Sequence, residues 1–140
     1  MKHVLGLRAV EGEFARLVEF AEEFACRCAL PDAERSRLLI ILEELFTNTI
    51  HYGYPEGAAD GWIEVVLACK PERIEIDFSD DGIPFDPLAQ DSLEFDRPDD
   101  ERGPGGLGLT IIRKLVHQAR YRRKGDRNCL ALVRRLRPSS

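Results

Sequence analysis

The sequence predicts an α/β two-layer sandwich, with one mixed, mostly antiparallel sheet and helices on one of its faces. Two patterns lead to this fold class. Stretches with apolar residues at helical spacing alternate with stretches rich in β-branched residues, in the order β, α, α, β, β, loop, α, β, β. The chain has 140 residues, 44% hydrophobic and 32% charged, so we expect it to fold as one domain over residues 1–140.

The first part of the chain predicts one strand and two helices. The strand covers residues 4–10, and apolar residues at helical spacing predict a helix over residues 11–30. Asp32 is a candidate N-cap for a second helix, which we expect over residues 33–52. Residues 55–61 have the composition of a loop and separate these elements from the strands that follow.

The rest of the chain predicts two hairpins separated by an irregular segment and a helix. The four strands of these hairpins are expected at residues 62–69, 73–78, 119–124 and 128–136. Residues 79–106 contain four prolines and few apolar anchors, which is typical of a loop that is either functional or disordered. Helical spacing resumes at Leu109.

The composition excludes several classes of protein. The longest apolar run, residues 38–42, is far too short to cross a bilayer, and no apolar stretch of a secretory signal is visible at the N-terminus. The net charge of −5 argues against a general nucleic-acid binder. The four cysteines lack the spacing of a zinc site, so we expect reduced thiols in a cytoplasmic protein without membrane contact.

Charge is unevenly distributed along the chain. Residues 75–101 hold eleven acidic residues and one basic residue, whereas residues 113–137 hold ten basic residues and one acidic residue. A solvated surface is the default interpretation of such runs. The alternative is a surface that docks partners through complementary charge.

A carboxylate and a carboxamide lie one turn apart on the second predicted helix. Glu44 and Asn48 are four residues apart, which places them on one face of that helix. The amide oxygen of Asn48 is a hard ligand suited to Mg²⁺, and the Glu44 carboxylate can accept a proton from an attacking hydroxyl or water. Taken alone, the pair also fits a solvated helix edge.

An acidic turn, SDDGIPFD in residues 79–86, directly follows a predicted strand. The carboxylate of Asp80 can accept a hydrogen bond from an amino group such as that of adenine. Gly82 would let the backbone turn and a flat ring approach closely. An ordinary Asp-Gly turn is the competing interpretation.

A glycine cluster, RGPGGLGLT in residues 102–110, leads into the last predicted helix. The start of a helix presents free N–H groups and a positive dipole end to an anion such as a phosphate. A flexible linker that ends in a helix cap is the alternative. The segment differs from a Walker A loop, because Gly-Lys-Ser and Gly-Lys-Thr occur nowhere in the chain.

In this order and at these distances, the three motifs resemble those of the Bergerat-fold ATP-binding superfamily, which includes gyrase, Hsp90, histidine kinases and MutL. Within it, the chain is most similar to the anti-sigma-factor serine/threonine kinases of bacterial partner-switching systems. The stretches EELFTNTIHYGYPEG, SDDGIPFDP and RGPGGLGLTIIRKLVHQ carry this resemblance, which covers nearly the whole chain. It implies a Bergerat ATP-binding fold with ATP and Mg²⁺ as cofactors.

The resemblance implies a role for each motif residue. Asn48 would bind ATP through the Mg²⁺ that it coordinates, Glu44 would be the catalytic base, and Asp80 would accept the adenine amino group. Residues 85–104 would form the lid over the nucleotide. The other ATP-binding positions would be Gly82, Pro84 (where histidine kinases more often carry glycine), Gly105, Gly106, Leu107, Gly108, Leu109 and Thr110.

The resemblance also implies a reaction and partners. We expect a homodimer that transfers the γ-phosphoryl group of ATP to a serine or threonine of a STAS-domain antagonist and sequesters a target such as a sigma factor. One alternative is a non-catalytic module that binds ATP or ADP to shape a partner-binding surface. Another is a detached histidine-kinase catalytic domain, although none of the three histidines lies in the context of a phosphoacceptor helix.

Overall fold

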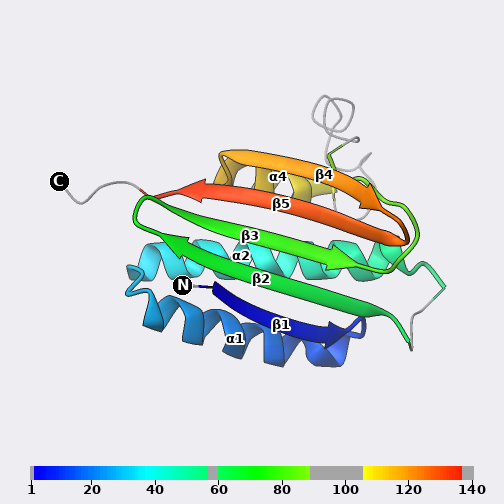
Figure 1. Ribbon diagram of the computed structural model, residues 1–140, viewed down its shortest axis with the longest axis horizontal. Helices are drawn as coiled ribbons and strands as arrows, with labels where there is room; N and C mark the ends of the chain where they lie inside the picture. The colour runs from blue at the N-terminus through cyan, green and yellow to red at the C-terminus, as the bar shows by residue number, and fades with distance from the viewer. Residues whose placement is uncertain (1, 57–59, 89–105, 137–140) are drawn as a thin grey trace.

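The computed structural model describes residues 2–56, 60–88 and 106–136, with the backbone alone for residues 106–110. Figure 1 shows the arrangement of the elements. Their bounds are β1 (Lys2–Arg8), η1 (Glu11–Glu13), α1 (Phe14–Arg27), α2 (Asp32–Asn48), η2 (Thr49–Gly53), β2 (Trp62–Lys70), β3 (Arg73–Asp80), α4 (Gly106–Leu115), β4 (Gln118–Lys124) and β5 (Arg127–Arg135).

The five described strands form one sheet in the order β1-β2-β3-β5-β4. Every neighbouring pair is antiparallel. The three described α-helices lie against one face of this sheet, with α2 between α1 and α4, and no described element covers the other face (Figure 1). The structure therefore confirms the predicted two-layer sandwich.

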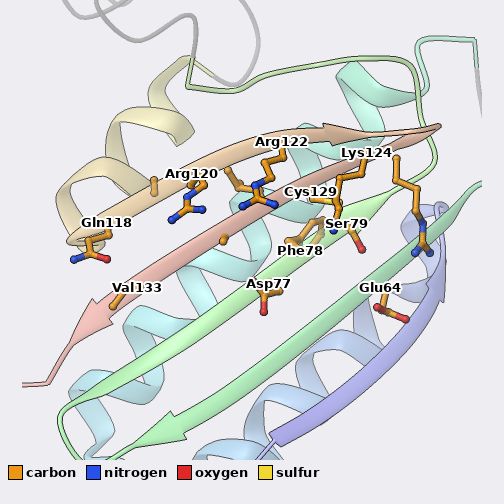
Figure 2. A pocket seen from close by; sticks show the side chains of 14 residues that line it. Glu64, Asp77, Phe78, Ser79, Gln118, Arg120, Arg122, Lys124, Cys129 and Val133 are labelled. Carbon is orange, nitrogen blue, oxygen red and sulfur yellow. The ribbon is translucent and has the colours of Figure 1, made fainter.

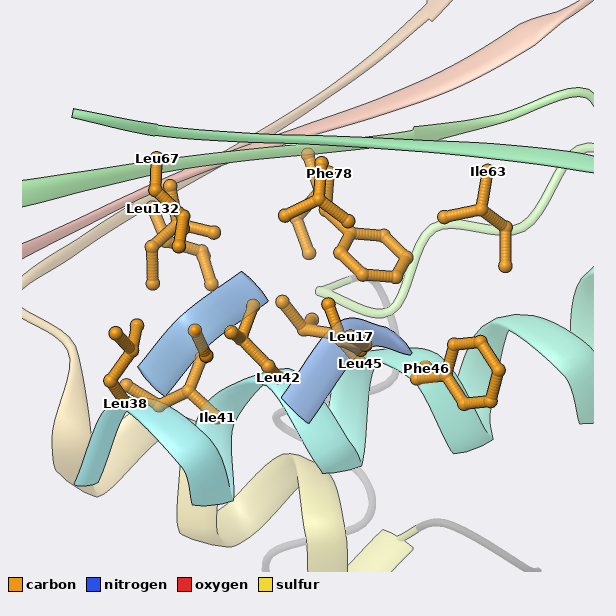
Figure 3. Close-up of a cluster of buried hydrophobic side chains, with 14 of the residues drawn as sticks. Leu17, Leu38, Ile41, Leu42, Leu45, Phe46, Ile63, Leu67, Phe78 and Leu132 are labelled. Carbon is orange, nitrogen blue, oxygen red and sulfur yellow. The ribbon is translucent and has the colours of Figure 1, made fainter. Parts of the chain in front are cut away.

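The hydrophobic core lies between the sheet and the helices (Figure 3). Alternate residues of β2, including Ile63 and Leu67, point toward the helices and are fully buried, as the pleat of a strand requires. Leu38, Ile41 and Leu42 of α2 face them at helical spacing. Each such side chain stabilises the fold by about 1.5–3 kcal/mol relative to its exposed state.

The start of α2 corrects one prediction. Asp32 is not the N-cap: Pro31 occupies that position, with φ −58° and ψ 154°, and no side-chain cap hydrogen bond forms there. Asp32 is instead the first helical residue, where its carboxylate interacts favourably with the helix dipole. Proline takes the cap position because its ring holds φ near the observed value while the chain is still extended.

Other boundaries shift by a few residues. The α-helical part of the second helix ends at Asn48, and Thr49–Gly53 forms a π-helical turn. The third strand continues to Asp80, so Asp80 is the last residue of β3 and does not lie in the loop. The last helix begins at Gly106, three residues before the predicted Leu109, because helical spacing cannot detect a first turn built from glycines.

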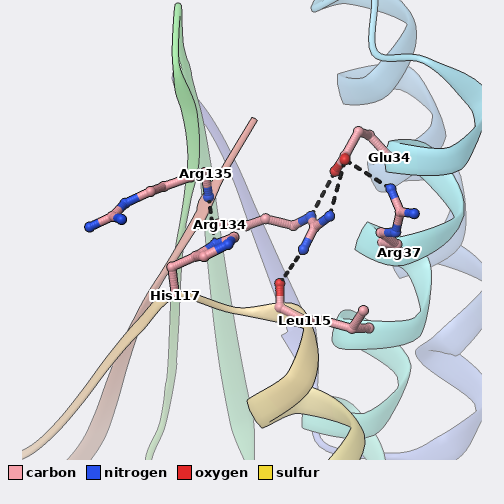
Figure 4. A network of polar contacts seen from close by, with 6 residues as sticks. All are labelled: Glu34, Arg37, Leu115, His117, Arg134 and Arg135. Atoms are coloured by element: carbon pink, nitrogen blue, oxygen red, sulfur yellow. Dashed lines mark hydrogen bonds and ion pairs between the residues drawn. The ribbon is translucent and has the colours of Figure 1, made fainter. Parts of the chain in front are cut away.

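The N-terminal end of α2 is fixed to β5 and α4 by charged side chains (Figure 4). Arg134 of β5 donates two hydrogen bonds to Glu34, of 2.7 and 3.1 Å, and a third to the carbonyl oxygen of Leu115 at the end of α4. Arg37 adds a contact of 2.9 Å to the same carboxylate. The Arg134 guanidinium holds the pKa of Glu34 below its ordinary value. We call this group the Glu34 clamp.

Two further findings bear on the predictions. The described helices include none with both the length and the apolar character needed to cross a membrane. No disulfide joins Cys26, Cys28, Cys69 and Cys129, all of which lie within the described residues.

Candidate functional site

The C-terminal end of α2 and the adjacent ends of β3 and β5 enclose a cavity of about 30 Å³. Asn48 and Thr49 line it from the helix side, Asp80 and Asn128 line it from the sheet, and Phe85 closes one wall. Most ligand pockets have volumes of about 300–1,000 Å³. The cavity is therefore smaller than most ligand pockets.

Asn48 has the most unusual environment in this cavity. Its side chain is only 3% exposed, and neither Oδ1 nor Nδ2 has a hydrogen-bond partner among the described residues. A buried polar group without a partner costs about 1–3 kcal/mol. Such a group, directed into a cavity, is typical of a site completed by a ligand.

Asp80 lies across the cavity from Asn48 and is 6% exposed. Its Oδ1 accepts two hydrogen bonds, from the backbone N–H of Gly82 at 2.8 Å and from Nδ2 of Asn128 at 2.9 Å. Burial raises the pKa of the Asp80 carboxyl above its ordinary value, and these two hydrogen bonds oppose that shift. These two bonds leave Oδ2 as the other acceptor oxygen of a side chain that lines the cavity.

Gly82 is required by its contacts with the protein itself. A Cβ atom at this position would lie 2.5 Å from the carbonyl oxygen of Gly53 and 2.9 Å from Oδ1 of Asp80. The same Gly53 carbonyl accepts a hydrogen bond of 2.9 Å from the N–H of Ile83. The structure therefore explains Gly82 by the close approach of the π-helical turn to the acidic turn.

A second acidic residue of this turn fastens it to the neighbouring elements. Oδ1 of Asp81 accepts hydrogen bonds from the Tyr54 hydroxyl and from the backbone N–H of Trp62, the first residue of β2. Burial, followed by the bond to Asp81, raises the pKa of Tyr54. We call the contacts of Asp81 with Tyr54 and Trp62 the latch. The latch holds the end of η2 against the start of β2 and the end of β3.

Asn128 is a site residue that the sequence analysis missed. It is 4% exposed, lines the cavity and contacts Asp80, although 48 residues separate the two in the chain. Only the antiparallel register of β3 and β5, which pairs Asp80 with Asn128, brings them together. A lone Asn at the start of a predicted strand carries no local signal of this role.

Glu44 does not line the cavity. It lies one helical turn before Asn48 and is partly buried. Burial, and to a smaller extent the neighbouring Glu43, raises the pKa of Glu44 above its ordinary value. A raised pKa makes a carboxylate a better proton acceptor near neutral pH.

The remaining predicted positions differ in how far the structure describes them. Pro84 is exposed and does not line the cavity. Four residues of the predicted lid, 85–88, are described, and Phe85 stacks on Tyr52 with ring centroids 4.7 Å apart. Gly106, Leu107, Gly108, Leu109 and Thr110 form the first turns of α4, without described side chains. Gly105 and residues 89–104 lie outside the described residues.

A larger hollow, of about 710 Å³, lies on the open face of the sheet, away from these residues. Arg120, Arg122 and Lys124 project into it from β4, opposite Glu64 and Asp77 of β2 and β3 (Figure 2). Part of the basic run predicted from the sequence is thus an exposed column on an edge strand. Exposed basic side chains of this kind also protect a sheet edge from unwanted pairing.

Comparison with known proteins gives the family. The model of the histidine kinase-like ATPase domain matches residues 8–134. The chain belongs to this family. Its antiparallel sheet with helices on one face is the fold of the family. The matched region includes Asn48, Asp80 and Asn128.

Two relatives are a serine/threonine-protein kinase and a phytochrome. The serine/threonine-protein kinase BtrW of Bordetella bronchiseptica is 26% identical over 106 residues, which cover 76% of this chain and 74% of BtrW. A phytochrome of Mougeotia scalaris is 31% identical over 108 residues, 71% of this chain but only 10% of the phytochrome.

Solved structures share the fold at low sequence identity. A crystal structure of RsbU and RsbW domains from Mycobacterium tuberculosis matches 96% of this chain and 32% of that chain, with a TM-score of 0.66 and 14% identity. The catalytic domain of the histidine kinase ThkA matches 95% of this chain and 97% of its own length, with a TM-score of 0.53 and 16% identity. The geometry and the family together indicate a kinase-type ATPase domain.

Proposed function

We propose that this protein is an ATP-dependent protein serine/threonine kinase and anti-sigma-type regulator. It phosphorylates a STAS-domain antagonist and sequesters a target such as a sigma factor. The proposal rests on one observation: the Asn48 amide, which has no partner among the described residues, and the Asp80 carboxylate line the same cavity. The similarity to BtrW, a serine/threonine-protein kinase, supports this choice within the family.

The residues present fit a magnesium nucleotide. The unpartnered Oδ1 of Asn48 is a hard oxygen ligand of the kind that Mg²⁺ prefers. Within the described ranges, no group of three or more His, Cys, Asp or Glu side chains could hold a metal. An ion held by Asn48 would therefore take its other ligands from phosphate and water, which is common for Mg²⁺. Bound Mg-ATP supplies the γ-phosphoryl group.

Glu44 acts as the base in this proposal. The acceptor hydroxyl gives its proton to the Glu44 carboxylate as its oxygen bonds to the γ-phosphorus, and the bond to the β,γ-bridging oxygen breaks. Asp80 orients the adenine by accepting a hydrogen bond from its amino group. The N–H groups at the start of α4, from Gly106 onward, would bind the phosphates.

The test is transfer of labelled phosphate from ATP to a STAS-domain protein of the same organism. We expect acid-stable phosphoserine or phosphothreonine, and a loss of at least ~100-fold in rate for Glu44→Gln. The affinity for ATP should change little, because Glu44 does not line the cavity that contains Asn48 and Asp80. Glu43→Gln is the matched control: Glu43 is exposed on the same helical turn and makes only the smaller contribution to the raised pKa of Glu44, so the rate should fall far less than in Glu44→Gln.

Two outcomes would replace this proposal. ATP binding without transfer to any STAS-domain protein would support a non-catalytic module that uses the nucleotide to shape a partner-binding surface. Acid-labile label on a histidine would support a detached histidine-kinase catalytic domain, the alternative that the structural similarity to ThkA favours. Sedimentation of the purified chain tests the homodimer that we propose as its working form.

A further inference from the structure

Asn128 is held in one orientation by five hydrogen bonds. Its Oδ1 accepts from the backbone N–H of Phe85 at 3.2 Å, from the Tyr121 hydroxyl at 2.6 Å and from Nη1 of Arg123 at 3.2 Å. Its Nδ2 donates to Oδ1 of Asp80 at 2.9 Å and to the carbonyl oxygen of Ile83 at 2.8 Å.

This arrangement fixes which end of the amide faces Asp80. A flipped amide would place its NH₂ group against the N–H donors of Phe85 and Arg123, and its oxygen against two acceptors. Arg123 also donates a hydrogen bond of 2.9 Å to the carbonyl oxygen of Gly82. The hairpin of β4 and β5 therefore contacts the acidic turn through both Asn128 and Arg123.

The fixed amide has a consequence for Asp80. Together with the N–H of Gly82, it occupies Oδ1 with two donors and prevents rotation of the carboxylate. Oδ2 is then the acceptor that Asp80 offers to a ligand in the cavity. An acceptor held in a buried site selects ligands with an N–H donor at that point, because an unpaired acceptor in a buried site costs affinity.

We propose that Asn128 is a positioning residue for base selection: by holding Asp80 through Oδ1, it makes the site discriminate for a base with an exocyclic amino group. This inference rests on the proposed binding of ATP and extends it. Asn128 itself does not need to touch the nucleotide. Its hydrogen bond to Phe85 also ties the base-reading carboxylate to the first described residue of the predicted lid.

The test compares the affinities for ATP and for purine riboside triphosphate, which lacks the amino group but is otherwise the same ligand. We expect wild type to prefer ATP by about tenfold, the worth of one hydrogen bond to a charged group. Asn128→Asp keeps an acceptor for Phe85, Tyr121 and Arg123 but turns an oxygen toward Asp80. It should reduce the preference to within about threefold, with little change for the purine analogue.

Tyr121→Phe is a milder variant that covers failure of Asn128→Asp to fold. It removes one donor that orients the amide and should reduce the preference by an intermediate factor, while Arg120→Met, on the open face of the same strand, should leave it unchanged. The inference is overturned if wild-type preference persists in Asn128→Asp, or, where that variant does not fold, in Tyr121→Phe. An equal loss for both nucleotides would show a merely structural role and also overturn it. Wild type that binds neither nucleotide would refute the proposed function itself.

Discussion

The two ends of α2 each bury a polar side chain, and they treat it in opposite ways. At the N-terminal end, Glu34 is 13% exposed and its carboxylate accepts hydrogen bonds from Arg134 and Arg37. At the C-terminal end, Asn48 is 3% exposed and has no partner among the described residues. One helix thus joins a fully satisfied site to an unsatisfied one, about 14 residues or four turns apart.

The difference separates stability from function. The Glu34 clamp has a structural role. It links α2, β5 and α4, and Arg134 supplies a hydrogen bond to the Leu115 carbonyl at the end of α4, where helix carbonyls lack partners within the helix. Asn48 lowers stability unless something outside the described protein contacts it. A fold tolerates such a group where a ligand completes the site. A substitution that breaks the Glu34 clamp should therefore lower the stability of the fold. A substitution of Asn48 should instead weaken ligand binding without lowering stability.

The largest expected effect on stability is at the clamp. Arg134→Met should lower the free energy of unfolding by about 2–4 kcal/mol, because it leaves Glu34 and the Leu115 carbonyl without their main partner in a partly buried place. Chemical denaturation measures this change. Arg135→Met, at the adjacent exposed position, should change stability by less than about 0.5 kcal/mol. Equal effects of the two substitutions would refute the structural role of the clamp.

The clamp also predicts a pH dependence. Arg134 lowers the pKa of Glu34 in the folded state, so the stabilisation is present above the unfolded pKa and is lost as the pH falls through the folded pKa. The stability difference between wild type and Arg134→Met should therefore shrink below about pH 4. Denaturation at several pH values measures it. A difference that stays constant into acid would show that lost packing, and not the ion pair, is responsible.

At the other end, Asn48→Ala should weaken ATP binding by about 10- to 100-fold, because it removes a hydrogen-bonding group worth about 1.5–3 kcal/mol to a charged ligand. The free energy of unfolding should stay the same or rise by about 1 kcal/mol, since a buried unpartnered amide is lost and alanine favours the helix. Calorimetry and thermal unfolding measure the two effects. Thr47→Ala is the exposed control. Unchanged affinity in Asn48→Ala would contradict the site.

The smallest effect is expected at the latch next to the cavity. Tyr54→Phe removes a hydroxyl that donates to Asp81 and should lower the free energy of unfolding by about 1 kcal/mol. A small loss of ATP affinity should accompany it, because the latch holds the turn that carries Asp80. Tyr52→Leu is a useful contrast, since it removes the stacking on Phe85 and leaves the latch in place. An effect of Tyr54→Phe larger than that of Asn48→Ala on affinity would reverse the proposed ranking.

The sequence alone determined the element order, the fold class and the three motifs, because periodicity, caps and turn residues act between near neighbours in the chain. It placed Asn48 on the second helix, which the structure confirms, and Asp80 in the turn after a strand, whereas the structure makes Asp80 the last residue of β3. The tertiary structure alone decided which distant residues support them. Tyr54 and Asp81 are 27 residues apart, and Asp80 and Asn128 are 48 apart. Such pairs depend on strand order and register, which no local pattern encodes. The contact of Asn128 with Asp80 follows from the register of β3 and β5, and the Glu34 clamp follows from the contact of α2 with β5.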